Sequence, residues 1–205
     1  MCLKNYSSLI DNAYSYLGYR NIPRSKEIDL LIEECLKEVI ELSSFKYIYQ
    51  EFDYILEFLK QKPYLEYLKG ATSYYISAMT LGSDIDKRIK YYSISNMTKM
   101  CVFDACSSAY LEYLSDEYEK NLNENVSYRF CPGYQGTSLT DIKEIFKILK
   151  PEKVLGIELL ESNLMVPSKT MVGIIGINNK LEKNCGNCTN NNECAYLKAG
   201  RKCYL

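Results

Sequence analysis

Histidine is absent from this chain of 205 residues, and its absence excludes several kinds of chemistry. Without an imidazole, neither a Ser-His nor a Cys-His catalytic pair can form. Any metal site that the protein supplies must be built from thiolates, carboxylates or backbone oxygens. An excess of charge is missing as well, because 25 basic and 26 acidic residues leave a formal charge of −1. This balance gives no reason to expect nucleic acid as a partner.

Long hydrophobic runs are also missing. No segment approaches the roughly 18 apolar residues of a membrane span, so we expect no membrane partner. The first residues lead into tyrosines and Asp11 rather than into the apolar block of a signal peptide. We therefore expect a soluble, cytoplasmic globular protein. Thiols stay reduced in the cytoplasm, so the nine cysteines are expected to be ligands or buried thiols rather than a disulfide framework.

Helix signals occur in three parts of the chain: apolar residues recur with helical spacing in the first two, and the third begins with a cap-like segment at 138–141. Apolar residues three and four positions apart between Ile28 and Ile40 form one face of an amphipathic helix. Cys35 belongs to this face, so we expect it in the core. The predicted helices cover residues 26–42, 97–120 and 138–149, and Pro151 follows the last one as a stop signal.

Strand signals occupy the remaining apolar segments. Alternating aromatic residues predict a half-buried strand over 45–52 with a short helix after it, and β-branched and aromatic residues predict a buried strand over 71–82. Residues 154–177 predict two short strands around a turn at 167–169. Strands and helices alternate irregularly, so we predict an α+β fold. It would be a single domain with a mainly antiparallel twisted sheet flanked by helices, followed by a cysteine-rich C-terminal tail.

The stretch Arg-Phe-Cys-Pro-Gly-Tyr at 129–134 combines groups that suit a small ligand. Arg129 can hold a carboxylate or phosphate with two parallel hydrogen bonds, and Gly133 lets the main chain approach a ligand closely. Tyr134 adds a ring face and a hydroxyl. A zwitterion with an additional positive centre, such as S-adenosylmethionine, would suit these groups, because its cation can lie near aromatic faces or an acidic side chain. The alternative is an ordinary Pro-Gly turn with Arg129 in a surface ion pair.

The C-terminal tail contains four cysteines with the spacing C-x2-C-x5-C-x8-C, namely Cys185, Cys188, Cys194 and Cys203. Thiolates at this density in a segment too polar to fold alone are typical of a metal site, with free thiols as the alternative. Four thiolates suit structural zinc or an iron–sulfur cluster, and the irregular spacing matches neither zinc ribbons nor ferredoxins. We favour the cluster and keep zinc open.

Further segments follow the 129–134 stretch in a recognisable order with short gaps. They are GIELLES (156–162), MVP (165–167) and MVGIIGI (171–177). Together with RFCPGY, this order resembles the activation domain of cobalamin-dependent methionine synthase. Looser matches to the small stand-alone relatives of that domain are LGYR (17–20), TLG (80–82) and VFDACSSAYLEYL (102–114). The chain departs from the family at Leu160, where threonine is usual, and after Tyr134, where the fused enzymes have Cys-Pro.

The resemblance implies an activation-like domain over 1–177 and a metal-binding tail over 178–205. In methionine synthase, this domain binds S-adenosylmethionine and presents its methyl group to inactive cob(II)alamin while a flavodoxin or similar donor supplies one electron. The chain would then be a component of a methyltransferase in methionine biosynthesis. Its partner would be a cobalamin-dependent methionine synthase without its own activation domain, or another corrinoid protein, with a flavodoxin or ferredoxin-like electron donor.

The same resemblance implies roles for the residues of the 129–134 stretch. Arg129 would hold the carboxylate of S-adenosylmethionine. The backbone of Cys131, Pro132 and Gly133 would line its adenosyl part. Tyr134 would act at the face that meets the cobalamin. The cobalamin would be held by the partner, because this chain has no histidine to serve as its lower ligand.

Other residues are implied with open alternatives. Glu112 would neutralise the amino group of the ligand, or it would be an exposed helix residue. Glu161, with Ser162, would line the same site or would have a structural role at a strand end. A different function is open as well: a metal-binding adaptor or electron-transfer protein that keeps this fold without binding S-adenosylmethionine.

Overall fold

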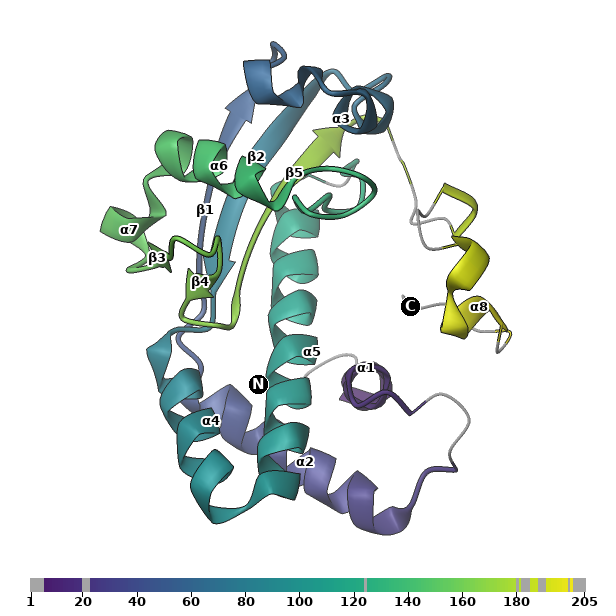
Figure 1. Cartoon of the computed structure of the whole chain (residues 1–205), viewed down its shortest axis with the longest axis vertical. Coiled ribbons are helices and arrows are strands. Elements are labelled where there is room, and N and C mark those ends of the chain that lie inside the picture. Colours follow the sequence, from purple (N-terminus) through teal and green to yellow (C-terminus); the bar gives the residue numbers. More distant parts are fainter. Residues whose placement is uncertain are drawn as a thin grey trace.

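The computed structural model describes residues 6–19, 23–123, 125–179, 181, 185–187, 191–198 and 200. The helices and strands of this part follow one another as shown in Figure 1. The α-helices are α1 (Tyr6–Tyr16), α2 (Lys26–Leu42), α3 (Lys62–Tyr67), α4 (Ser83–Ser95), α5 (Met97–Leu122), α6 (Ile142–Leu149), α7 (Pro151–Val154) and α8 (Ala195–Lys198). The strands are β1 (Lys46–Phe52), β2 (Ser73–Thr80), β3 (Glu158–Leu159), β4 (Met165–Val166) and β5 (Thr170–Ile177). Four short 3-10 helices are η1 (Glu57–Lys60), η2 (Leu139–Asp141), η3 (Cys185–Asn187) and η4 (Asn191–Glu193).

The main sheet is antiparallel and has the strand order β1-β2-β5. β2 is the central strand, and seven of its eight residues are buried, which suits its β-branched and aromatic side chains. β5 is an edge strand, and segment 126–130 lies along its outer side, where two isolated bridges join Val126 to Ile177 and Phe130 to Ile174. The 129–134 stretch therefore begins at this edge of the sheet.

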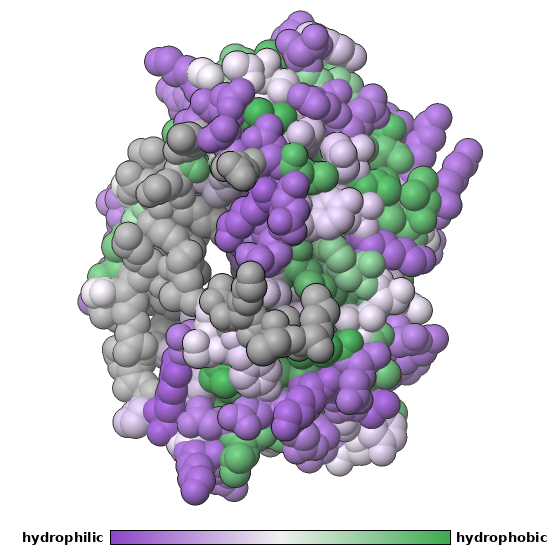
Figure 2. Space-filling model, turned by 180° about the vertical axis from the view of Figure 1, so that it is seen from behind, coloured by the Kyte–Doolittle hydropathy of each residue, from purple (hydrophilic) through white to green (hydrophobic). Residues whose placement is uncertain are grey.

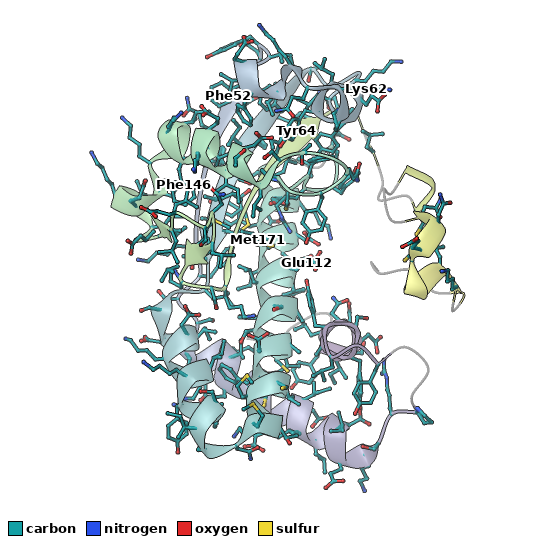
Figure 3. The ribbon with its side chains drawn as sticks, viewed as in Figure 1. Phe52, Lys62, Tyr64, Glu112, Phe146 and Met171 are labelled. Atoms are coloured by element: carbon teal, nitrogen blue, oxygen red, sulfur yellow. The ribbon has the colours of Figure 1, made fainter. Side chains whose placement is uncertain are left out.

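The two faces of the sheet are covered by different helices (Figure 1). Successive residues of a strand face opposite sides, so one face packs on α5 and the other on α6. On the α5 side, Met79 and Met171 join a core cluster built with α1, α2 and α4. On the α6 side, Ile76 and Ile174 join a second cluster, to which Phe52, Tyr64 and Phe146 also belong (Figure 3). The β3–β4 hairpin packs on this second cluster through Leu159 and Met165.

The predicted α+β class with an antiparallel sheet and flanking helices is confirmed. Helix α2 has the predicted bounds, and Cys35 is fully buried in the core. The strands predicted over 45–52 and 71–82 are β1 and β2, and the short helix after the first is present as η1 and α3. The helix predicted over 97–120 is α5, which continues to Leu122.

Other expectations need correction. Residues 154–177 form three strands rather than two, because the hairpin of β3 and β4 precedes β5. Pro151 does follow α6, but it also begins α7, where the first helical turn does not need the N–H that proline lacks. Helices α1 and α4 were not predicted. In α4 only Ile85 and Tyr92 are buried, so its sequence carries little hydrophobic periodicity.

The surface of the rear view is mostly hydrophilic, with hydrophobic side chains in separate patches (Figure 2). In the part of the chain that the structure describes, no helix combines the length and the apolar character needed to cross a membrane.

The buried thiols of the core provide a first prediction. Cys35 and Cys106 are fully buried, whereas Cys101 on α5 is exposed. Burial raises the pKa of Cys35 to about 12 and also raises the pKa of Cys106, so neither thiol forms much thiolate at pH 8. Because the thiolate is the reactive species, iodoacetamide should label Cys101 in the native protein and the other two only after unfolding. Peptide mapping by mass spectrometry measures this, and native labelling of Cys35 as fast as that of Cys101 would contradict the predicted packing.

Candidate functional site

Arg129 lies on the sheet edge beside β5, on the side of α5. Its neighbour Phe130 pairs with Ile174 through two backbone hydrogen bonds of 2.8 and 2.9 Å and packs in the cluster on the opposite face. The Arg129 side chain crosses Gly173 of β5. A Cβ added to Gly173 would lie 2.9 Å from Arg129 Cδ and closer still to Cγ. Glycine at this position therefore makes room for the arginine.

Two carboxylates of α5 pair with the Arg129 guanidinium. Nη1 donates to Glu119 Oε1, and Nη2 donates to Asp116 Oδ1 at 3.0 Å. The side chains of Arg129 and Glu119 are each 4% exposed, whereas that of Asp116 is 44% exposed. Burial alone would lower the pKa of Arg129, but Glu119 and Asp116 raise it above its ordinary value, so the guanidinium stays charged. Burial raises the pKa of Glu119, and Arg129 opposes this rise.

The paired carboxylates belong to an acidic stripe on α5. Glu112, Asp116 and Glu119 are four and three residues apart, which places them on one face of the helix. Glu112 accepts a hydrogen bond of 2.7 Å from the hydroxyl of Tyr16, at the end of α1. Figure 3 shows Glu112 near the middle of α5. The stripe therefore runs from α1 to the arginine.

Tyr16 also connects the stripe with the 129–134 stretch. Desolvation and the carboxylate of Glu112 raise the pKa of Tyr16, Tyr134 raises it further, and Arg129 lowers it. Glu112, Arg129 and Tyr134 therefore each lie within electrostatic reach of the Tyr16 hydroxyl. The four residues come from three parts of the chain that are distant in sequence.

The loop after Arg129 is held in shape by Thr137. The N–H of Gly133 donates to Thr137 Oγ1 at 3.1 Å, and this hydroxyl donates to the carbonyl oxygen of Tyr134 at 2.7 Å. Gly133 has φ of +89°, a conformation that glycine adopts without strain. Pro132 is buried, whereas Tyr134 is 70% exposed. The loop therefore presents the Tyr134 side chain outward from a well-connected backbone.

The structure brings most of the predicted binding residues together and separates one. Glu112 belongs to the acidic stripe, Arg129 pairs with two other carboxylates of the stripe, and the loop Cys131–Tyr134 follows Arg129 directly. Glu161 lies in the exposed turn between β3 and β4, on a hairpin that packs against the α6 face of the sheet. Since Arg129 lies on the α5 face, Glu161 is placed apart from it, and its role in binding stays a prediction.

Sequence reasoning did not identify four residues of this site. They are Tyr16, Asp116, Glu119 and Thr137. A threonine three positions after Tyr134 is a usable signal, because threonine hydroxyls commonly close turns on nearby backbone groups. Asp116 and Glu119 carry no such signal, because their arginine partner is on another segment.

The groups of this arrangement are suited to holding a small charged ligand. It offers one guanidinium, a row of carboxylates, exposed tyrosine rings and a glycine-containing loop. These groups fit a zwitterion with an extra positive charge: the arginine suits a carboxylate, and carboxylates and aromatic faces suit cations.

Neither a family model nor a curated protein matches this chain. Among solved structures, the chain is similar to one described as the crystal structure of the MetH reactivation domain bound to AdoHcy. The TM-score is 0.54 with 15% sequence identity, over 86% of this chain and 78% of that chain. This chain has the fold of the MetH reactivation domain. The resemblance noted in the sequence is thereby confirmed at the level of the fold.

The cysteine tail that follows this reactivation-domain fold is described only in part. Cys185 lies in η3, and Cys194 directly precedes α8. Cys188 and Cys203 lie outside the described residues. Where the chain is described, no group of three or more cysteine, aspartate, glutamate or histidine residues is placed to hold a metal ion. The metal site of four thiolates, and the domain boundary at 177, stay predictions.

Replacement of Gly173 by alanine tests the packing of Arg129. The added Cβ should displace the arginine from Glu119, and breaking a buried ion pair costs about 3–5 kcal/mol. The matched control is Gly176→Ala on the same strand, whose Cβ would meet only the amide end of Asn179 among its nearest atoms. Urea unfolding monitored by circular dichroism should show that Gly173→Ala lowers the free energy of unfolding clearly more than Gly176→Ala does. Equal losses would contradict the proposed contact.

The tail gives a separate prediction. Protein purified under anaerobic conditions should contain zinc or an iron–sulfur cluster, measured by plasma mass spectrometry together with visible absorption. Cys185→Ser and Cys194→Ser should each lower the metal content strongly, because a four-thiolate site loses a ligand. Cys101→Ser is the control, since Cys101 is an exposed cysteine on α5. Metal-free wild-type protein from iron- and zinc-supplemented cultures would contradict the prediction.

Proposed function

We propose that this chain binds S-adenosylmethionine and serves in the reductive methylation of cob(II)alamin held by a partner. The partner would be a cobalamin-dependent methionine synthase or another corrinoid protein. The observation that carries the proposal is the position of Arg129: it pairs with Asp116, one helical turn from Glu112, and directly precedes the Cys131–Tyr134 loop. In support, the fold is similar to that of a reactivation domain solved with AdoHcy, S-adenosylhomocysteine, the product of methyl transfer from S-adenosylmethionine.

Each end of the ligand has a suitable group in this site. Arg129 would hold the carboxylate by charged hydrogen bonds, which are stronger than neutral ones. Glu112, on the same helix face as the arginine's partners, would face the amino group. The backbone of Cys131, Pro132 and Gly133 would line the adenosyl part, where the absence of a Cβ at Gly133 permits close approach.

The reaction needs orientation rather than acid–base groups. Methyl transfer from a sulfonium to cobalt involves no proton transfer, so a chain without histidine is suited to it. S-adenosylmethionine supplies the methyl group, while the cobalamin comes with the partner and the electron with a flavodoxin or ferredoxin-like donor. The contribution of this chain is to hold the donor at near-attack distance. Tyr134, exposed at the loop, would lie at the face that meets the cobalamin.

One observation favours the alternative of an adaptor or electron-transfer protein. Both terminal nitrogens of Arg129 have carboxylate partners within the chain, as expected where the fold is kept and the ligand has been lost. The two functions differ in whether S-adenosylmethionine binds at all, and a direct titration separates them.

Calorimetric titration with S-adenosylmethionine under anaerobic conditions tests the proposal. Wild-type protein should show saturable binding. Arg129→Lys keeps a cation beside Glu119 but loses the two-pronged geometry, so its affinity should fall about tenfold or more, the loss expected for a charged hydrogen bond. Arg129→Ala is less suitable, because it leaves the carboxylate of Glu119 buried without its partner.

Arg88→Lys is the matched control, since Arg88 pairs with Glu38 in another arginine–glutamate contact, on α4. It should bind like the wild type, and thermal melting should show that both lysine variants are folded. Absence of binding by the wild type, with and without a corrinoid protein, would reject the proposal and favour the adaptor. Binding would lead to cob(II)alamin reactivation assays with the partner, followed by visible absorption.

A further inference from the structure

The two partners of Arg129 differ in how firmly the structure holds them. Glu119 is 4% exposed and also accepts a hydrogen bond of 3.2 Å from the Tyr47 hydroxyl of β1. Asp116 is 44% exposed and contacts Nη2 from the solvent side at 3.0 Å. The guanidinium therefore has one buried partner and one partially hydrated partner.

This difference decides which partner a ligand can replace. Removing Glu119 from the pair would leave a buried charge without compensation, which is strongly unfavourable. Asp116 can leave Nη2 and be hydrated, because ion pairs with an exposed member contribute little to stability. A carboxylate arriving from solvent meets the nitrogen that Asp116 occupies.

We propose that Asp116 is an internal competitor for the carboxylate of the ligand. In the free chain its carboxylate occupies Nη2 of Arg129. When S-adenosylmethionine binds, the ligand's carboxylate takes this nitrogen and Asp116 turns into solvent. Glu119 stays on Nη1 throughout. The inference rests on the proposed function, and it makes Asp116 a residue that sets affinity.

A second contact of the site follows the same pattern. Glu112, which would meet the amino group, accepts a hydrogen bond from Tyr16 in the free chain. Both groups expected to hold the ends of the ligand are thus engaged by side chains of the protein itself. Ligand binding is then an exchange of partners. The apparent affinity equals the intrinsic affinity multiplied by the fraction of molecules in which Nη2 of Arg129 is not held by Asp116.

Asp116→Asn and Asp116→Ala test the competition. S-adenosylmethionine carries one net positive charge, so removing a nearby carboxylate should weaken binding if its charge alone mattered. Loss of the competitor has the opposite effect, because the ligand no longer has to displace Asp116. We expect the dissociation constant to fall about threefold, which matches the free energy of a partly exposed ion pair. Calorimetry with S-adenosylmethionine and with S-adenosylhomocysteine measures both ligands.

The control is Glu117→Gln, which removes a carboxylate one position further along α5. Glu117 contacts Lys120 instead of Arg129, so its variant should bind no more tightly than the wild type. Thermal melting should confirm that all variants are folded. Binding that is tighter in both Asp116 variants than in the wild type supports the inference.

Other outcomes separate the two levels of the argument. Unchanged or weaker binding in the Asp116 variants, with clear binding by the wild type, overturns the competition and leaves the proposed function intact. No binding by the wild type or by either Asp116 variant overturns the proposed function, and the inference with it.

Discussion

The buried ion pair of Arg129 and Glu119 is the contact on which the site depends. Two charges removed from water are tolerable only when they are paired and hydrogen-bonded. Here the pair joins α5 to the sheet edge, and the Tyr47 hydroxyl adds a contact from β1. A different rotation of α5 would leave one charge buried alone. The pair therefore determines which face of α5, with Glu112 and Asp116, is turned toward the Cys131–Tyr134 loop.

The same contact explains why two distant motifs occur together. Arg129 opens RFCPGY, and Gly173 belongs to MVGIIGI. The arginine side chain passes directly over the glycine, so a larger residue at 173 would exclude it. The second glycine of that motif, Gly176, donates its N–H to Ser127 Oγ at 2.9 Å. Gly173 makes room for the Arg129 side chain and the backbone N–H of Gly176 binds Ser127, so both positions of β5 hold segment 126–130, which leads into the loop.

Strong hydrophobic periodicity made much of the fold predictable from the sequence. Contacts between segments that are distant along the chain were not predictable in this way. Helix α2 buries one face and strand β2 buries both faces, so the hydrophobic pattern of each sequence is clear. Helix α4 buries only Ile85 and Tyr92 and has no such pattern. In the site, Arg129 was identifiable from its neighbours along the chain. Glu119 was not, because an acidic residue opposite an apolar stripe looks solvent-exposed until its arginine partner, ten positions away, is placed over it.

The balance of charge bears on how such a site would handle its ligand. The carboxylates of Glu112, Asp116 and Glu119 outnumber the one guanidinium of Arg129, and an excess of negative charge favours a cation nearby. In the proposed function the incoming ligand carries a sulfonium, and methyl transfer removes that positive charge. The surplus carboxylates would then attract the methyl donor more strongly than the product. The acidic stripe that neutralises the arginine would in this way also help the product to leave.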